Sequence, residues 1–476
     1  MGVTFKSKLT SVASNINFRI DHRFHNYVQN EVAFKSIPFS RFLIEISNGK
    51  DISPNNYDDF DSSDIIYPSV NNFKGGEIKL DDVTFIKDSY PIPKELENDD
   101  IIISRSGTVG ITYVWNYEEV ISYFKRDIKA IPSGYLIVVK VDTKKIVPHF
   151  IKLIFNSNHY KKYFNVFGVG KTQKNIAQPD ILSIPIPLVE YLKQKELLEK
   201  IKPIETKISE LKNSKKQPIN IINQVFGEVF GFNWDEFEKT KQVNTYSSSI
   251  SKFANNIDCR MGIRFHNEAG AYIQSFLESK TNKRIKDFIS EPIVLGKSVS
   301  PSDYDEDGEY FYIAMSNIKS WAFDPEDCKK VSEIYAASNL NKTVKKGDIL
   351  LARSGEGTIG KVALIEEEDI NGIFADFTQR IRLTGFDPLC AYYYMRSEFF
   401  QYLVYTHKKG LGNNTNIFPS QIKEFPIPDW DEIKQAEIVE KIKTQLDTQK
   451  VIDQQVEVKQ QEIDKIIENV IKQEQN

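Results

Sequence analysis

The chain has 476 residues, which predicts about three domains and allows more than one hydrophobic core. Hydrophobic residues at 40% and charged residues at 27% are ordinary for a globular protein and exclude a disordered or fibrous chain. Lys and Arg number 62 and Asp and Glu number 66, so the net charge is −4, an unusual balance for a protein that binds nucleic acid.

Apolar runs and cysteines add further exclusions. No run approaches the ~18 apolar residues of a membrane span, and the first residues lack the apolar core of a signal peptide. Cys259, Cys328 and Cys390 are far apart and odd in number, so they indicate neither a disulfide framework nor a metal-binding pair. We therefore expect a cytoplasmic protein that does not act on a membrane.

The second half of the chain repeats the first at an offset of about 241 residues. Four matches occur in the same order in both halves, which is hard to explain by chance. The matching segments are 19–26 with 260–267, 100–110 with 348–360, 175–187 with 416–428, and 194–202 with 435–443.

In the first copy, β-rich runs at 101–103 and 135–139 lie between Gly, Asn, Asp and Pro clusters, which predicts a domain of short strands and loops. After the Pro-Ile-Pro run at 185–187 the spacing of the apolar residues changes from that of strands to that of a helix. Pro203 predicts a kink or break in the helix that follows, because proline removes a backbone donor and clashes with the preceding turn. The apolar seam of this coiled-coil helix, with spacings of four and three residues, is Leu197, Ile201, Ile204, Ile208 and Leu211.

The second copy ends in a matching helix that is four residues longer, about one turn or ~6 Å. Residues 188–216 carry a net charge of +3 and residues 429–476 carry −5, which favours pairing of the two helices. Two helices that merely expose charged faces to solvent could carry the same net charges, but the apolar seam present in both copies favours packing of the helices against each other. The second seam is Ile438, Ile442, Leu446, Val456, Ile463, Ile467 and Val470.

Motifs for catalysis are weak in both copies. The run 355–360 fits GxGxxG, but a strand is predicted after it, so a tight turn between strands is the better interpretation than a dinucleotide site. The run 170–172 resembles only the end of a P-loop. Asp180 has Gln421 at the equivalent place, so it is predicted to cap or turn the chain and not to serve a nuclease.

The six histidines show no metal-ligand spacing. His25 and His266 recur beside Arg23 and Arg264, where they could contact phosphate or hold a turn, and a structural role is favoured. The tetrad expected of an adenine methyltransferase is missing. We predict a non-catalytic chain with no metal and no cofactor of its own.

Polar, glycine-rich loops occupy the same place in both copies, at 168–175 and 408–416. Asn and Gln can pair with adenine, Lys can reach guanine or phosphate, and glycines let backbone amides approach phosphate, so we predict DNA contact in preference to a merely polar surface loop. The loop candidates are Lys171, Thr172, Gln173, Lys174, Asn175, Lys408, Lys409, Asn413, Asn414, Thr415 and Asn416. Further candidates are Lys74, Arg105, Thr108, Asn317, Lys319, Arg353, Thr358 and Lys361.

These residues together carry a family resemblance. Two strand-rich domains, each with an Arg-Ser-Gly run at 105–107 or 353–355, a polar loop, a Pro-Ile-Pro exit and a heptad helix, resemble the specificity subunit of a type I restriction-modification system. The resemblance covers nearly the whole chain, although residues 1–14 match no family element and Pro203 departs from a continuous helix. It implies two target-recognition domains, each reading half of a split double-stranded DNA site, held apart by two antiparallel helices.

The predicted fold is therefore α+β, with two duplicated strand-rich domains separated by two long helices in an antiparallel coiled coil. Its boundaries are 1–187 and 232–428 for the recognition domains, and 188–231 and 429–476 for the helical spacers. The resemblance implies that the helices set the gap between half-sites and dock two methyltransferase subunits, and that the assembly recruits restriction subunits. S-adenosylmethionine, ATP and Mg would belong to those partners.

The competing interpretation is a coiled-coil adaptor that does not bind DNA. It explains the helices and the acidic balance but not two polar glycine loops at matching places. Without residues 429–476 the remaining chain has a net charge of +1, so the acidity lies chiefly in one helix. The charge therefore does not exclude DNA binding.

Overall fold

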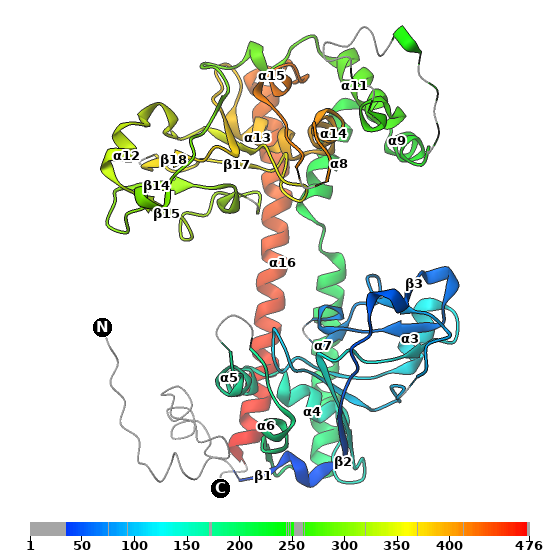
Figure 1. The fold of residues 1–476 in the computed structure, drawn as a ribbon. Coiled ribbons are helices and arrows are strands. Elements are labelled where there is room, and N and C mark those ends of the chain that lie inside the picture. The colour runs from blue at the N-terminus through cyan, green and yellow to red at the C-terminus, as the bar shows by residue number, and fades with distance from the viewer. Residues whose placement is uncertain are drawn as a thin grey trace. The chain divides into compact units, whose positions relative to one another are not determined.

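The computed structural model describes residues 35–473 apart from short gaps, and Figure 1 draws it as a ribbon. The gaps are 75, 93, 171–173, 244, 246, 248, 252–259, 261, 319, 369 and 413. The chain forms two compact units. The first joins Met1–Asn213 to Asp453–Asn476, and the second is Ser214–Ile452.

The first unit is built on two four-stranded sheets. One is antiparallel with the order β2-β11-β8-β9, and the other has the order β10-β4-β7-β3 with β10 and β4 parallel. Two-stranded ribbons join β1 to β12 and β5 to β6. The strands are β1 (Ser36–Pro38), β2 (Leu43–Asn48), β3 (Tyr57–Asp58), β4 (Ile65–Tyr67), β5 (Phe73–Lys74), β6 (Glu77–Ile78), β7 (Thr84–Ile86), β8 (Ile101–Ser104), β9 (Thr112–Val114), β10 (Lys129–Ala130), β11 (Leu136–Val141) and β12 (Pro185–Pro187).

Strand β8 is buried on both faces, which is why it reads as an uninterrupted apolar run. Ile101 and Ile103 belong to the core beneath the helices, whereas Ile102 belongs to a second core on the other side. The helices of this unit are α3 (Tyr117–Phe124), α4 (Pro148–Phe155), α5 (Asn158–Phe167), α6 (Gln178–Leu182) and α7 (Tyr191–Ser214), joined by the end of α16 (Glu432–Gln473).

The second unit repeats the antiparallel sheet as β13-β19-β16-β17 and adds a three-stranded sheet, β15-β14-β18. Its strands are β13 (Val294–Leu295), β14 (Tyr310–Ile313), β15 (Lys329–Val331), β16 (Ile349–Ala352), β17 (Val362–Leu364), β18 (Gly372–Phe374) and β19 (Thr378–Ile381). Its helices are α8 (Pro218–Phe230), α9 (Trp234–Lys241), α11 (Glu268–Lys280), α12 (Glu333–Ala337), α13 (Pro388–Arg396), α14 (Glu398–His407), α15 (Pro419–Ile422) and the first part of α16.

Short 3-10 helices connect many of these strands. They are η1 (Phe39–Phe42), η2 (Pro54–Asn56), η3 (Phe60–Ser62), η4 (Val70–Asn72), η5 (Ile263–His266), η6 (Ile285–Asp287), η7 (Pro301–Asp303), η8 (Met315–Asn317) and η9 (Leu340–Lys342).

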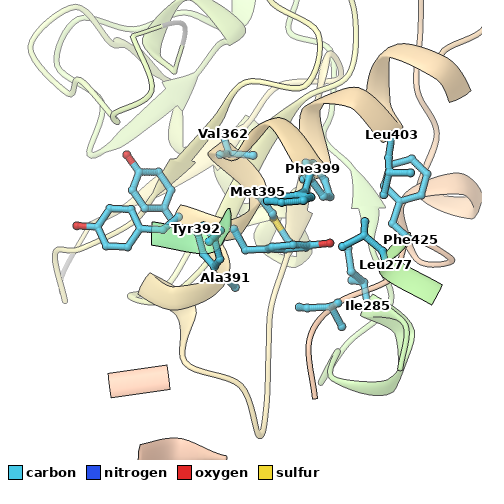
Figure 2. Packing of buried hydrophobic residues seen from close by; sticks show 14 of the residues in the cluster. Leu277, Ile285, Val362, Ala391, Tyr392, Met395, Phe399, Leu403 and Phe425 are labelled. Atoms are coloured by element: carbon cyan, nitrogen blue, oxygen red, sulfur yellow. The ribbon is translucent and has the colours of Figure 1, made fainter. Parts of the chain in front are cut away.

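The main core of the second unit lies between the antiparallel sheet and its helices. Figure 2 shows Met395 and Phe399 packed near Val362 of β17, with Leu277 and Phe425 closing the cluster. Aromatic rings are prominent in this core, and such rings bury large apolar areas. The first unit has the equivalent core beneath α4 and α5.

Each unit contains helices from both copies of the repeat. The first unit has α7 and the end of α16, and the second has α8 and the first part of α16. In the first unit α7 packs against the red end of α16 with the opposite chain direction (Figure 1), and Leu197, Ile201 and Ile208 share one core with Ile463 and Ile467. Asn158 adds hydrogen bonds from its backbone N (3.2 Å) and Nδ2 (2.7 Å) to the buried Asp464 carboxylate. Burial raises the pKa of Asp464.

The remaining seam positions divide between the units. Ile438 and Ile442 are buried with α8 in the second unit and Leu446 packs at the edge of that core. Ile204, Val456 and Val470 are partly buried in the first unit. Leu211 is half-buried.

The prediction that Pro203 breaks the first helix is wrong. Helix α7 runs through Pro203 to Ser214, and the interruption comes at 215–217, before Pro218 opens α8. Pro203 is exposed, so the helix can be held by the seam on its other face despite a cost of about 3 kcal/mol. Pro218 instead occupies the first turn of a helix, where proline is tolerated.

Candidate nucleic-acid interface

In each unit a central strand of the antiparallel sheet ends in an Arg-Ser-Gly turn. Gly110 donates its N–H to the carbonyl of Ser104 at 2.9 Å, and Gly360 makes the same bond to Ala352 at 2.8 Å. Both glycines have φ near +88°, and a Cβ on Gly110 would lie 2.2 Å from the Phe164 ring. Only glycine fits this position. The prediction of a tight turn between strands at 355–360 is confirmed, because β16 and β17 pair directly across it.

The polar loop of each unit is joined to this turn by backbone hydrogen bonds. Ile176 donates to the carbonyl of Arg105 and Ile417 to that of Arg353, both at 2.9 Å. Short bridges pair Ser106 with Asn175 and Ser354 with Asn416. The structure thus brings together the two groups of candidates that lie some 60 to 70 residues apart in the sequence.

An exposed aromatic ring stands on the other side of the turn in both units. The N–H of Arg105 donates to the carbonyl of Tyr135 at 3.0 Å, and that of Arg353 to Phe377 at 2.9 Å. Tyr135 is 55% exposed and Phe377 47% exposed. Each interface therefore consists of an arginine between an aromatic ring and a polar loop.

The two arginines differ in their local partners. Arg353 donates from Nε to the carbonyl of Asp376 at 2.9 Å, and its guanidinium lies 5.8 Å from the Phe377 ring centre. The guanidinium also lies 5.7 Å from the Phe418 ring centre, and these contacts together fix the side chain. Arg105 is half-buried.

Three predicted DNA contacts are placed inside the second unit. Asn317 is buried and its amide bonds to the backbone of Ala314 and Asp324. Lys408 and Thr415 are buried and bond to the Glu356 carboxylate at 2.7 and 3.1 Å. The hydrogen bond from Lys408 holds the pKa of Glu356 below its usual value. Lys408 and Thr415 therefore stabilise the loop at 408–416 from within, whereas Asn317 stabilises the chain around η8.

The other described candidates lie at or near the surface. Lys74, Thr108, Asn175 and Asn414 are exposed, and Lys174 is half-buried, with Nζ 3.1 Å from both the carbonyl and Oδ1 of Asn165. Half-buried candidates of the second unit are Thr358, Lys361, Lys409 and Asn416. Lys171, Thr172, Gln173, Lys319 and Asn413 lie outside the described residues.

Sequence reasoning missed a Gly-Lys pair that bridges, in each unit, to the backbone two residues before the exposed aromatic residue. Lys50 pairs with Ser133 and Lys297 with Ala375 in parallel bridges, and both lysines are exposed. The carbonyl of Lys50 accepts a hydrogen bond from the Tyr67 hydroxyl at 2.7 Å. The same bond joins Tyr312 to Lys297 at 2.9 Å, so a Gly-Lys pair followed by a buried tyrosine was the missed signal.

Within the part of the chain that the structure describes, no cluster of three or more His, Cys, Asp or Glu is arranged to hold a metal ion. No described helix is both long and apolar enough to cross a membrane.

A family model described as type I restriction modification DNA specificity domain matches the chain twice, over residues 43–220 and 278–474. No curated protein matches the chain. Among solved structures, a chain from work on the structural basis underlying complex assembly and conformational transition of the type I R-M system is 12% identical, with a TM-score of 0.43. That match covers 94% of this chain and 98% of the other.

Two further solved structures are similar over most of their length. The type I restriction-modification system S subunit from M. genitalium is 10% identical with a TM-score of 0.37, and the match covers 93% of this chain and 97% of that one. The HsdS subunit from Thermoanaerobacter tengcongensis is 11% identical with a TM-score of 0.31, and the coverage is 92% and 97%.

A chain with two copies of one sheet, turn and loop, each followed by a long helix, has the construction of a two-domain DNA-recognition protein. The two family matches span most of its length, and the chain belongs to the type I restriction-modification DNA specificity family. It is a DNA sequence-recognition subunit, and the adaptor interpretation is not favoured. The specificity subunits of this family are non-catalytic.

Proposed function

We propose that each unit reads one half of a bipartite DNA site. One observation carries the proposal: the turn, loop and aromatic ring recur in both units while the polar side chains on them differ. A common frame with different hydrogen-bonding groups suits two half-sites of different sequence, because base edges are distinguished by their donor and acceptor patterns.

The test is to express the chain with its methyltransferase partner and to map methylated sites by long-read sequencing. We expect Lys174→Ala combined with Asn175→Ala to relax one half-site only, and Asn414→Ala combined with Asn416→Ala to relax the other. Lys87→Ala, at an exposed lysine outside the interface, is the control. Exchange of residues 1–187 for another recognition domain should change the same single half-site. A change in both halves would refute the modular reading.

We propose further that the long helices set the unread gap between half-sites. Helix α16 continues without interruption from Glu432 to Gln473, and its two parts belong to different units. Four residues inserted near Asn213, or four removed from α16, should change the gap by one or two base pairs at ~3.4 Å each, since one helical turn is ~6 Å. An unchanged gap in the methylation map would contradict this role.

Partner docking is proposed at the start of each long helix. Leu192 and Ile433 occupy equivalent positions in the repeat and are 71% and 73% exposed. Two equivalent apolar side chains suit two copies of one partner, which we take to be methyltransferase subunits. Leu192→Asp and Ile433→Asp should each remove one copy in co-purification with mass measurement. Ile334→Asp, at an 83% exposed position in α12, should remove neither.

We assign the chemistry to partner subunits: S-adenosylmethionine to the methyltransferases, and ATP and Mg to restriction subunits that join the complex. The complex would work in the cytoplasm, where chromosomal DNA is available. Equilibrium dialysis of the purified chain with labelled S-adenosylmethionine or ATP should detect no binding, whereas the assembled complex should bind both. Binding by the chain alone would contradict this division of roles.

A further inference from the structure

The aromatic rings at the two interfaces occupy the same register of the same pair of strands. Ser104 pairs with Leu136 and Ala352 pairs with Thr378, so Tyr135 and Phe377 each precede the first paired residue of the inner strand. Side chains alternate along a strand, and this places each ring on the sheet face that carries the main helical core, beside the arginine that follows the partner strand. The two rings correspond in structural position and not in local sequence, because the amino acids around them differ between the copies.

Within the described part of the chain, burial in the core accounts for only about half of each of these two residues, although Phe377 also lies 5.8 Å from the Arg353 guanidinium. The neighbouring residues on the inner strands, Leu136 and Thr378, are completely buried, whereas the rings stand about half in water. Leaving apolar ring surface in water forgoes roughly 25 cal/mol per Å² of burial. An exposed ring kept at the same point of both copies therefore suits a surface that becomes covered when a ligand binds.

The surroundings of the rings define the ligand. Arg105 and Arg353, whose backbones pair with those of Tyr135 and Phe377, supply a cation beside each ring, and the amide-bearing loop lies on the far side of the arginine. A cation beside a flat apolar ring matches a nucleotide, which offers a phosphate next to a base face. Aromatic rings stack on bases in unstacked or opened nucleic acid, and apolar wedges inserted at base steps kink the duplex.

We infer that Tyr135 and Phe377 are stacking contacts, one in each half-site, that cover a base face exposed by local opening of the duplex, and that Arg105 and Arg353 bind the adjoining phosphate. The inference rests on the proposed function and deepens it. Hydrogen bonds from the loops then report base identity, while the rings add affinity that depends little on sequence.

The test uses the chain in complex with its methyltransferase partner and DNA in which 2-aminopurine, whose fluorescence reports stacking, replaces single bases of either half-site. Tyr135→Ala should raise the Kd for specific DNA about tenfold, within the range measured for single stacking contacts. It should also abolish the fluorescence change in the half-site read by the first unit only. Phe377→Ala should do the same in the other half-site.

Conservative variants separate a ring contact from a structural effect. Tyr135→Phe and Phe377→Tyr keep the ring and should bind with nearly unchanged Kd and fluorescence. Tyr123→Ala removes another ring that is 50% exposed, on α3, and should change neither. Arg105→Ala should lower the salt dependence of binding by about one phosphate contact and leave the fluorescence change in place.

The inference is overturned if Tyr135→Ala binds like the unsubstituted complex with the same fluorescence, or if Tyr135→Phe loses as much as Tyr135→Ala. Failure of the proposed function looks different. In that case the complex would bind the mapped site no better than unrelated DNA even with both rings intact.

Discussion

Gln194 and Gln435 are buried at equivalent positions and make the same pair of hydrogen bonds. The Oε1 atom of Gln194 accepts the N–H of Val147 at 2.9 Å, and that of Gln435 accepts the N–H of Asp387 at 2.6 Å. Their Nε2 atoms donate to the carbonyls of Val189 and Trp430. Each glutamine therefore ties the first turn of a long helix to the residue that precedes α4 or α13.

Replacing either glutamine should destabilise its own unit. Gln194→Ala leaves the half-buried N–H of Val147 without its hydrogen-bond partner, which costs about 1–3 kcal/mol, and it also creates a small cavity. We expect faster amide exchange in α4 and the start of α7, measured by hydrogen–deuterium exchange mass spectrometry. Gln435→Ala should act in α13 and α16. Gln224→Ala, at an exposed glutamine on α8, should leave both regions unchanged.

A buried ion pair distinguishes the two copies. Arg382 binds Asp348 through Nε and Nη2, both at 2.7 Å, and Asp348 is completely buried. Asp348→Asn removes one of the two carboxylates that pair with a largely buried arginine, the other being Glu291 at 2.7 Å, so we expect the free energy of unfolding of the second unit to fall by about 3 kcal/mol. Urea unfolding followed by tryptophan fluorescence would measure this free energy. A loss below about 1 kcal/mol would contradict a stabilising role for the pair of Arg382 and Asp348.

Asp100, the equivalent residue of the first copy, provides the matched comparison. It is buried and accepts the N–H of Glu97 at 2.9 Å, but Lys140, which stands at the position of Arg382, pairs with Glu97 instead. Burial raises the pKa of Asp100, so its charged form costs stability above the ordinary carboxyl pKa, and protonation recovers it as the pH falls. Asp100→Asn should therefore not lower stability at pH 7, unlike Asp348→Asn.

His407 should make the second unit sensitive to mild acid. Burial lowers the pKa of His407 to about 4, and its Nδ1 lies 2.9 Å from the carbonyl of Leu403. The unfolded chain takes up the proton near pH 6.5 and the folded unit does not, so stability is lost as the pH falls from 6.5 towards 4, by up to about 3 kcal/mol.

Thermal melting at pH 7, 6 and 5 would show this loss. His407→Asn offers an amide nitrogen in place of Nδ1 and cannot be protonated there, so the variant should melt with a smaller pH dependence in that range. The titration of carboxylates is common to both proteins and cancels in the comparison. Parallel curves for the two proteins would exclude His407 as the cause.

Salt titration would identify arginines that bind phosphate. Arg353→Ala should weaken binding to specific and unrelated DNA alike and reduce the slope of log K against log salt by about one. Arg396→Ala removes an arginine at the C-terminal end of α13 that hydrogen-bonds to the Tyr392 hydroxyl at 2.8 Å. The slope of log K against log salt should be the same for this variant as for the unsubstituted chain. Loss of specific binding with an unchanged slope would assign Arg353 to a base instead.

Repetition and periodicity made much of the architecture predictable. The duplicated Asp-led strands, the turn at 355–360 and the seam residues Ile201 and Ile442 follow from local patterns, and the structure has β8, β16 and buried seam positions there. The prediction of a break at Pro203 was wrong because helix propensity describes a residue and its sequence neighbours only. Packing along the other face of α7 carries the helix past it, and the chain breaks at 215–217 instead.

The candidate interface was less accessible to sequence reasoning. A lysine and a threonine in a polar loop look like surface groups, yet Lys408 and Thr415 turn inward to a single glutamate that lies some 50 to 60 residues earlier in the chain. Tyr135 and Phe377 look like core residues, yet they face water. The direction of a side chain depends on partners distant in the sequence, and the repeat alone cannot supply them.

The division of α16 between the units has a consequence for synthesis of the protein. Ile463, Ile467 and Ile471 complete the core of the first unit, although a ribosome adds them some 250 residues after Ile208 of the same core. The first of the two units is thus completed only after the second has been translated, and its apolar seam stays open until then. A chain cut short anywhere before Asp453 would leave that seam uncovered and be a natural substrate for chaperones and proteases.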